Sequence, residues 1–424
     1  MTYNTIFSPA EILLPKADTA ADWQKWAVIA CDQFTSQMDY WNDCVSLIGG
    51  GKSTYDYILP EAYLGTEKEA SHGAEIAENM AAFDPASMNT FCGIVYLERT
   101  LPDGSVRHGM VGKMDLEAYS YAKDSRSPIR ATEATILERI PPRQKIRAAA
   151  TVELPHILVL ISDKPEDGIF ASLDSVKGTL PVLYDFDLML GGGHVKGKFI
   201  SGIGFAAINR ALAELATPEM MQAKYGVETS PLLFAIGDGN HSLASAKALY
   251  EEIKGEIGAE AAASHPARYA LCEIVNLHDE ALDFEPIYRV LFGVEPEAFV
   301  AELSAHLATL SGTAAPQTFT LAAGEARWNL RAETPVSQLA VGTVQAFLDD
   351  YVAAHPGVTV DYIHGEDTAC QLAERENTVA ILFDGMAKNM LFKTVICDGA
   401  LPRKTFSMGH AQDKRYYVEC RKIR

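Results

Sequence analysis

The sequence predicts an α+β protein in which mixed sheets and helices form two units. The chain has 424 residues, which is more than one hydrophobic core usually serves, and 48% of them are hydrophobic. Short apolar, β-branched runs alternate with segments whose apolar residues recur three and four positions apart. This pattern restarts near residue 293. We therefore expect a larger N-terminal unit at 1–292 and a smaller α+β unit at 293–424.

Local patterns place the elements along the chain. Strands are expected where apolar runs end in turn residues, at 24–31, 91–98, 151–162 and 231–236. Helices are expected where apolar residues follow helical spacing, at 203–216 and 242–255. The second unit repeats both patterns. Its helices are expected at 295–310 and 341–354, and its strands at 316–331, 358–363, 378–384 and 391–397.

Charge and composition restrict the partners and the compartment. The 36 Lys and Arg against 56 Asp and Glu give a formal net charge of −20, which would repel a nucleic-acid backbone. No apolar run of about 18 residues predicts a membrane span, and the N-terminus lacks the basic start and apolar run of a secretory signal. A cytoplasmic protein without nucleic-acid or membrane partners is expected. The seven cysteines contain no Cys-x-x-Cys pair and are interpreted as reduced core residues.

Several common chemistries lack their sequence motif. The 11 histidines show no His-x-His, His-x-x-x-His or His-Glu-x-x-His spacing, and no Gly-x-Ser-x-Gly elbow or complete dinucleotide fingerprint occurs. Gly49-Gly-Gly-Lys-Ser-Thr54 resembles the end of a phosphate loop, but Ser46 stands where the first glycine belongs. The segment before it also has helical spacing instead of a buried strand. We therefore expect neither zinc, haem nor NAD.

The turn at 237–242 is the main candidate site. It joins the expected strand at 231–236 to the expected helix at 242–255, and a helix start presents unpaired N–H groups and the positive end of the dipole to an anion. Its glycines permit positive φ and close backbone approach, and its polar side chains can cap the helix. The candidate ligand-binding residues are Gly237, Gly239, Asn240 and Ser242.

Two side chains of this turn are candidates for chemistry. Asp238 could bind Mg²⁺ or accept a proton, and His241 could donate to a phosphate or carboxylate. The alternative is a strand-to-helix turn whose polar groups only satisfy local backbone hydrogen bonds.

Cations are scarce in this acidic chain and gather in two further segments. Arg139 and Arg143 flank two prolines, which should hold an extended backbone and place both side chains to bind a phosphate. Near the C-terminus, Arg403 and Lys404 precede the hydroxyl of Thr405, a set suited to an anion. The alternatives are a salt-bridged solvated surface for the first segment and a basic tail for the second.

Six stretches of the sequence resemble a bacterial and archaeal family known as domain of unknown function 1015. The resemblance extends over essentially the whole chain and names no chemistry. The stretches are Trp26–Ser36 with Tyr40-Trp41, Ile129–Glu133, Arg139–Arg143, Glu153–His156, Gly237–His241 and Leu401–Ser407.

A second, local resemblance concerns Asp238-Gly-Asn-His241. It is similar to the Asp-Gly-x-His-Arg element of the ParB and sulfiredoxin-like fold, whose members bind nucleotides and include kinases of free serine. Ser242 stands where that element has its phosphate-binding Arg, so Arg139, Arg143, Arg403 or Lys404 would have to substitute. The family's association with serine-biosynthesis genes also implies serine as a candidate substrate.

Two functions follow from these residues. The first is a phosphotransfer enzyme that uses ATP or ADP with Mg²⁺ on Asp238, with Asp32 or Glu133 activating a small hydroxylated metabolite. The second is a sensor of nucleotides or phosphorylated metabolites that has no turnover. In either case the acidic chain needs local cations, so we expect Arg403 and Lys404 to lie within ~10 Å of the turn.

Overall fold

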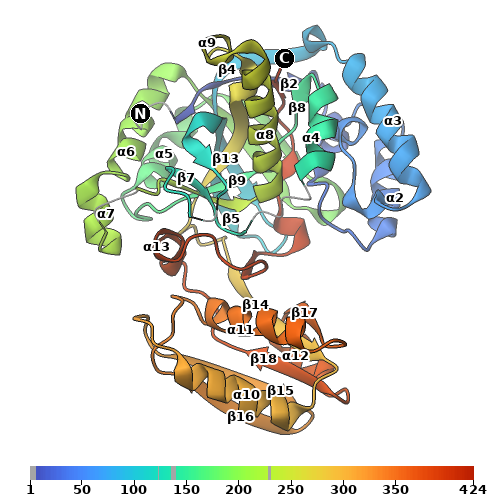
Figure 1. Cartoon of the computed structure of the whole chain (residues 1–424). Helices are drawn as coiled ribbons and strands as arrows, with labels where there is room; N and C mark the ends of the chain where they lie inside the picture. The colour runs from blue at the N-terminus through green and yellow to red at the C-terminus, as the bar shows by residue number, and fades with distance from the viewer. Residues whose placement is uncertain (1–5, 123, 135–139, 228–230) are drawn as a thin grey trace. The chain divides into compact units, whose positions relative to one another are not determined.

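The computed structural model describes residues 6–122, 124–134, 140–227 and 231–424 (Figure 1). The chain divides into two compact units. Unit 1 comprises Met1–Ala131, Thr135–Leu282 and His410–Arg424, and unit 2 comprises Thr132–Ala134 and Asp283–Gly409. The sequence prediction placed the division at 292/293, which would separate a whole strand, β14 (Phe284–Phe292), from the sheet whose strands it pairs with.

Unit 1 contains a mixed sheet in which the described residues form 11 strands. Both pair types occur, since β13 pairs with β5 antiparallel and with β9 parallel. This arrangement confirms the predicted α+β class. The strands lie in the order β10 (Val182–Asp187), β11 (His194–Ile200), β4 (Met88–Thr100), β5 (Val106–Asp115), β13 (Tyr269–Asn276), β9 (Leu158–Ile161), β12 (Phe234–Asp238), β7 (Ile129–Ala131) and β6 (Tyr119–Ser120), with β1 (Phe7–Ser8) beside β5 and β2 (Ala10–Pro15) beside β4.

Helices cover this sheet, and two short strand pairs lie beside it. The pairs are β3 (Val28–Ile29) with β20 (Tyr416–Tyr417), and β8 (Val152–Glu153) with β21 (Arg421–Lys422). No helix in the described part of the chain has the length and apolar character needed to cross a membrane. The helices are α1 (Ala20–Trp26), α2 (Met38–Ile48), α3 (Glu67–Ala81), α4 (Ile140–Ala149), α5 (Ile169–Val176), α6 (Gly202–Glu214), α7 (Pro218–Tyr225), α8 (Asn240–Ile257) and α9 (Ala259–Ala262).

Both faces of the central strands are buried, which explains their continuous apolar sequence. Successive side chains of a strand point to opposite faces. In β4, Ile94 and Tyr96 belong to one core cluster with side chains of α5, α6 and α8, whereas Val95 and Leu97 belong to a second cluster with side chains of α2. A strand enclosed in this way needs apolar residues at every position. The strand expected at 91–98 is accordingly confirmed within β4.

Four other expected elements are wrong or only partly right. The strand expected at 316–331 is a hairpin of two strands, β15 (Gln317–Ala323) and β16 (Ala326–Ala332). The segment 24–31 is the end of α1 followed by the two-residue β3, and the expected strand at 151–162 is divided into β8 and β9. The expected strand at 391–397 is helix α13 (Met390–Cys397), whose buried residues Leu391, Phe392, Thr394 and Val395 follow helical spacing. Of the seven cysteines, Cys92 and Cys397 are exposed, so the expectation of seven core residues fails for these two.

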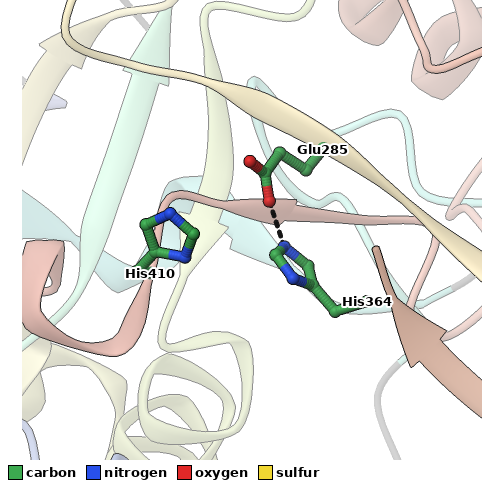
Figure 2. Close-up of side chains that lie close together, drawn as sticks. All are labelled: Glu285, His364 and His410. Carbon is green, nitrogen blue, oxygen red and sulfur yellow. Dashed lines mark ion pairs between the residues drawn. The ribbon is translucent and has the colours of Figure 1, made fainter. Parts of the chain in front are cut away.

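Unit 2 is an α+β unit with a second sheet. Glu285 on β14 and His364 on β17 form an ion pair beside the end of this strand pair (Figure 2). The strands lie in the order β16 (Ala326–Ala332), β15 (Gln317–Ala323), β18 (Thr378–Leu382), β14 and β17 (Thr359–His364), with β19 (Phe406–Met408) beside β14. The other helices are α10 (Pro296–Thr309), α11 (Ala340–Ala354) and α12 (Glu366–Leu372).

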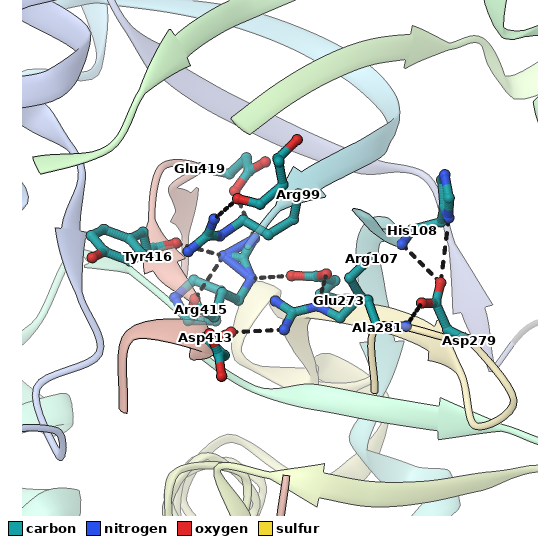
Figure 3. Close-up of polar contacts among 12 residues, drawn as sticks. Arg99, Arg107, His108, Glu273, Asp279, Ala281, Asp413, Arg415, Tyr416 and Glu419 are labelled. Atoms are coloured by element: carbon teal, nitrogen blue, oxygen red, sulfur yellow. Dashed lines mark hydrogen bonds and ion pairs between the residues drawn. The ribbon is translucent and has the colours of Figure 1, made fainter. Parts of the chain in front are cut away.

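Buried charges attach the C-terminal segment His410–Arg424 to the rest of unit 1 (Figure 3). The Arg415 side chain is 3% exposed, and its Nε lies 2.9 Å from Oε2 of Glu273 on β13. Its Nη2 donates to Oε2 of Glu419 at 2.7 Å, and Oε1 of Glu419 accepts the hydroxyl of Tyr184 at 2.5 Å. A buried charge is tolerated only when it is paired and hydrogen-bonded. Because these side chains are shielded from water, their charges depend on one another, and their pairing fixes the segment to unit 1.

Replacing Arg415 with alanine should destabilise unit 1 by about 3–5 kcal/mol, because Glu419 would remain buried without its cation and Glu273 would keep only Arg107 at 3.9 Å. Tryptophan fluorescence during urea unfolding suits this measurement, since Trp23, Trp26 and Trp41 lie in unit 1. The exposed Arg424→Ala is the control and should change stability by no more than about 0.5 kcal/mol. Equal stability of Arg415→Ala and Arg424→Ala would contradict this account of the segment.

Candidate functional site

The candidate turn is shorter than the sequence suggests. The strand β12 extends through Gly237 to Asp238, and α8 already begins at Asn240, so Gly239 alone joins them. Its φ is +78°, and a Cβ there would lie 3.0 Å from the Ile157 side chain, so only glycine fits. The predicted strand and helix are confirmed. The buried part of β12 fixes the turn, because this strand pairs with β7 on one side and β9 on the other.

The start of α8 has no side-chain cap. The N-cap residue is Gly239, and the expectation that Asn240, His241 or Ser242 caps the helix is wrong because all three already belong to its first turn. The side-chain oxygen Oδ1 of Asn240 is buried and accepts no hydrogen bond from the part of the chain that the structure describes. The carbonyl of His241 accepts the hydroxyl of Ser245 at 2.8 Å, as in an ordinary helical turn. A helix start without a side-chain acceptor keeps its affinity for an anion.

Asp238 is the last residue of β12 and lies beside this helix start. Its Oδ1 accepts the backbone N–H of Gly239 at 2.9 Å, and its Oδ2 lies 3.3 Å from Nζ of Lys414. Both side chains are mostly buried. Lys414 comes from the C-terminal segment that Arg415 anchors, so a cation distant in sequence lies at the turn.

Asp32 follows the short strand β3 and lies beside a histidine and a tyrosine. Its Oδ2 is 3.9 Å from Nε2 of His156, and its Oδ1 accepts the side-chain amide of Gln33 at 3.0 Å. The hydroxyl of Tyr417 lies 2.7 Å from Nδ1 of His156 and accepts the backbone N–H of Cys31 at 3.2 Å. The hydrogen bond of Tyr417 to Nδ1 orients the His156 ring, with Nε2 on the side of Asp32.

The pKa of Asp32 is lowered from its ordinary value of 3.8. Burial opposes ionisation, but the charge of His156, the amide of Gln33 and the charge of Lys414 together outweigh it. The carboxylate is 29% exposed and therefore accessible. Lys414 thus forms an ion pair with Asp238 and helps to lower the pKa of Asp32. Unit 1 brings together two carboxylates, one lysine and an uncapped helix start.

Unit 2 brings together a different set of the predicted residues. The guanidinium of Arg403 lies over the ring of Tyr362 at 4.9 Å from its centroid, and its Nε donates to the Tyr362 hydroxyl at 3.0 Å. Nζ of Lys404 lies 5.8 Å from the same centroid. Both basic side chains are exposed. Thr405, in contrast, is buried and its hydroxyl donates to the carbonyl of Pro402 at 2.7 Å, so it closes the turn instead of facing outward.

Arg289 supports the turn that contains Arg403 and Lys404. Its side chain is fully buried in β14, and it donates to the carbonyls of Lys404 at 3.0 Å and Arg403 at 3.2 Å. Burial lowers the pKa of Arg289 to about 10, an effect that Tyr362 and Glu133 partly offset. Glu133, in the segment Thr132–Ala134, forms a bridge with Leu401. Lys404 itself has a φ of +52°, a strained conformation for a residue with a side chain.

The other two cations predicted to bind phosphate are Arg139 and Arg143. Arg139 lies outside the described residues. Arg143 lies in α4, which begins at Ile140, so the expectation of an extended backbone there is wrong. Pro141 and Pro142 occupy the first turn of this helix, where a proline needs no N–H and its fixed φ suits the helix.

Three residues of the unit 1 cluster were missed in the sequence: Lys414, His156 and Tyr417. His156 lies in one of the stretches that carry the family resemblance, and Lys414-Arg415 is a basic pair in an acidic chain. Both were weak signals. The prediction that Arg403 and Lys404 approach the turn stays a prediction, because Arg403 and Lys404 belong to unit 2 and the turn belongs to unit 1.

The chain is a mixed α+β protein, and several solved structures show a distant similarity to its fold. SbnI from Staphylococcus aureus with a C-terminal truncation is 13% identical, with a TM-score of 0.34, covering 70% of this chain and 83% of its own. A free serine kinase variant in complex with AMP is 11% identical, with a TM-score of 0.38, covering 73% and 91%. A conserved hypothetical protein from Pyrococcus furiosus is 12% identical, with a TM-score of 0.35, covering 73% and 94%.

The family is established by sequence. The model of the family DUF1015, described as a protein of unknown function, matches residues 13–351, and the chain belongs to this family. No curated protein matches the chain. The recognition made from the six stretches is thus confirmed.

Asp32 should stabilise the fold in a pH-dependent way. Because its pKa is lowered on folding, its contribution is complete above the ordinary value of 3.8 and is lost as the pH falls through the lower folded value. The stability difference between the parent and Asp32→Asn should stay constant from pH 7 to about pH 4 and shrink at lower pH. Urea unfolding at a series of pH values measures it, with the exposed Asp39→Asn as control. A difference that already shrinks between pH 7 and about pH 5 would mean that the pKa is raised instead.

Proposed function

We propose that this protein transfers a phosphoryl group between ATP or ADP and a small hydroxylated metabolite. One observation carries the proposal: Lys414 pairs with Asp238 beside the start of α8, and its charge also lowers the pKa of Asp32. Phosphoryl transfer consists mainly of positioning and charge neutralisation, and it needs no strong protein nucleophile. A helix start with a lysine provides the neutralisation, and the partly exposed carboxylate of Asp32 provides the proton acceptor.

The phosphate would bind at the first turn of α8. The N–H groups there and the positive end of the helix dipole attract an anion, and Lys414 adds a full charge. Lys414 is held by Asp238 at 3.3 Å, a distance that leaves its ammonium free to donate to a phosphate oxygen as well. Arg403 and Lys404 are a second set of cations that we propose for phosphate binding, because the net charge of −20 makes any anion site depend on local cations.

Asp32 would accept the proton of the substrate hydroxyl. The hydroxyl oxygen forms a bond to phosphorus while the bond from phosphorus to the leaving phosphate oxygen breaks, and the proton passes to the Asp32 carboxylate. Its lowered pKa keeps Asp32 ionised at neutral pH, as an acceptor must be. Serine is the first substrate to test, since the turn resembles that of free-serine kinases.

The donor set at Asp238 also fits Mg²⁺, which prefers one or two carboxylates together with phosphate oxygens. Asp238 would hold the ion through Oδ2, the oxygen that now faces Lys414. The ion would supply further neutralisation of the phosphate charge.

A non-catalytic sensor is the second candidate, and the pairing of Asp238 favours it. Both oxygens of this carboxylate are engaged, by Gly239 and by Lys414. A phosphate that took Lys414 away would release Asp238 and loosen the C-terminal segment. This change would report ligand binding without any turnover.

Asp32→Asn should lower kcat by about 10²–10⁴-fold while ADP affinity stays within about twofold, because the carboxylate takes the proton but does not bind the phosphate. Phosphorus NMR of ATP, Mg²⁺ and serine or another small alcohol follows the loss of the γ-phosphate and the appearance of a phosphomonoester. ATP that stays intact with every alcohol, although ADP binds, would favour the sensor.

Lys414→Ala and Arg403→Ala should each weaken ADP binding by about tenfold or more, because each removes a charge-assisted hydrogen bond to phosphate. Isothermal titration calorimetry measures the affinity, and the exposed Lys52→Ala is the matched control that should leave it unchanged. Unchanged affinity in Lys414→Ala would remove the helix start from the site. Unchanged affinity in Arg403→Ala would remove only the unit 2 cations.

A further inference from the structure

A second polar cluster of unit 1 lies on the β4–β5 strand pair. Glu98 of β4 and His108 of β5 are direct cross-strand partners, and α5 places Asp174 beside them. One ligand atom from each of the three residues lies within 4.8 Å of the others, and His108 Nε2 is 3.9 Å from Asp174 Oδ1. Two carboxylates and an imidazole at this spacing have the separation of ligands around one ion, given small side-chain adjustments.

A neighbouring carboxylate fixes the direction of His108. Nδ1 of its ring lies 3.3 Å from Oδ2 of Asp279, and the same oxygen accepts the backbone N–H of His108 at 3.0 Å (Figure 3). Asp279 is itself held by the N–H of Ala281 at 2.9 Å. This arrangement leaves Nε2 directed to Asp174. Metal-binding histidines usually have such a carboxylate partner on the other nitrogen.

Tyr96 provides an independent observation. It lies two residues before Glu98, on the same face of β4, and its ring stacks on that of His108. The residue is 0% exposed, and within the described residues its hydroxyl makes no hydrogen bond. Because Tyr96 shares a face with Glu98 and stacks on His108, its side chain lies beside the three ligand residues. An unsatisfied buried hydroxyl is costly and indicates a missing partner.

Two lysines balance the carboxylates. Nζ of Lys177 lies 3.0 Å from Oε1 of Glu98 and 2.6 Å from Oδ1 of Asp174, and Nζ of Lys198 lies 2.7 Å from Oε2 of Glu98. The Lys177 side chain is 34% exposed, whereas that of Lys198 is 8% exposed. The ammonium group of Lys177 can therefore move out into solvent at little cost in free energy, whereas that of the buried Lys198 cannot. The position between Glu98 and Asp174 is thus held by a replaceable cation.

We propose that Glu98, His108 and Asp174 bind a divalent transition-metal ion that displaces the ammonium group of Lys177. The imidazole nitrogen favours Zn²⁺ or Mn²⁺ over Ca²⁺ and Mg²⁺, which prefer oxygen ligands only. A water on the ion would give the Tyr96 hydroxyl a partner. The ligand spacings searched for in the sequence cannot detect such a site, because its three ligands come from two strands and a helix.

Calorimetric titration of the chelator-treated full chain with Zn²⁺ tests the proposal, with Ca²⁺ as the comparison ion. The parent should bind one Zn²⁺ far more tightly than Ca²⁺. His108→Asn should weaken Zn²⁺ binding by about 100-fold, and Asp279→Asn by about 10–100-fold through loss of the ring's orientation. His265→Asn replaces a histidine that is not among the proposed ligands and caps the short helical turn Pro266–Arg268; it is the control and should bind as the parent does.

Lys177→Gln separates a metal site from a salt-bridge network. It removes the internal competitor and should tighten Zn²⁺ binding by about two- to fivefold. Weaker binding in Lys177→Gln, or equal binding by the parent and His108→Asn, would overturn the proposal and leave an adventitious ion only. Circular dichroism of each variant checks its fold. Asp32→Asn should retain full Zn²⁺ affinity, so failure of the phosphotransfer proposal leaves this one testable.

Discussion

The buried Arg415 is the constraint on which the candidate site depends. It pairs with Glu273 of the central strand β13 and with Glu419 of its own segment. If Arg415 moved away, two buried carboxylates would lose this ion pair, which is energetically costly. The residues on either side are thereby fixed. Lys414 lies at Asp238, and Tyr416–Tyr417 pairs with β3, which ends three residues before Asp32. The buried charge of Arg415 thus helps to bring Lys414 to Asp238, although these residues are distant in sequence.

The electrostatics of the cluster explain how an acidic protein could bind an anion. Lys414 lies at Asp238 and also lowers the pKa of Asp32, so one cation serves two carboxylates. The start of α8 adds the positive end of its dipole, and no side chain caps it. An incoming phosphate would meet this positive end and Lys414, while Mg²⁺ would offset Asp238. The carboxylates that would repel the ligand are the groups that the proposed chemistry needs.

Structural features that depend on neighbouring residues in the sequence could be predicted from it. The buried strand β12 and the helix α8 follow from an apolar run and helical spacing around glycine, and both Asp238 and Asp32 were identified as candidates. The prolines at 141–142 were misinterpreted because proline suits an extended segment and a first helical turn equally well. For α1, the capping box of Thr19 and Asp22 was an available signal that the β-branched run after it obscured.

Features caused by tertiary contacts could not be predicted. The basic pair Lys414-Arg415 was only a weak signal, because the role of Lys414 depends on strand pairing and on Arg415. The same holds for His156, whose direction is set by Tyr417, and for Arg289, which supports the Arg403 turn. Sequence patterns indicate which groups suit a chemistry, whereas the buried charges decide which of them meet.

A crystal structure of the chain grown with ADP and Mg²⁺ tests the central claim most directly. The account predicts a phosphate group hydrogen-bonded to backbone N–H groups of the first turn of α8, with Nζ of Lys414 within hydrogen-bond distance of a phosphate oxygen. A nucleotide bound elsewhere, with Lys414 still on Asp238 and the start of α8 facing only solvent, would contradict it.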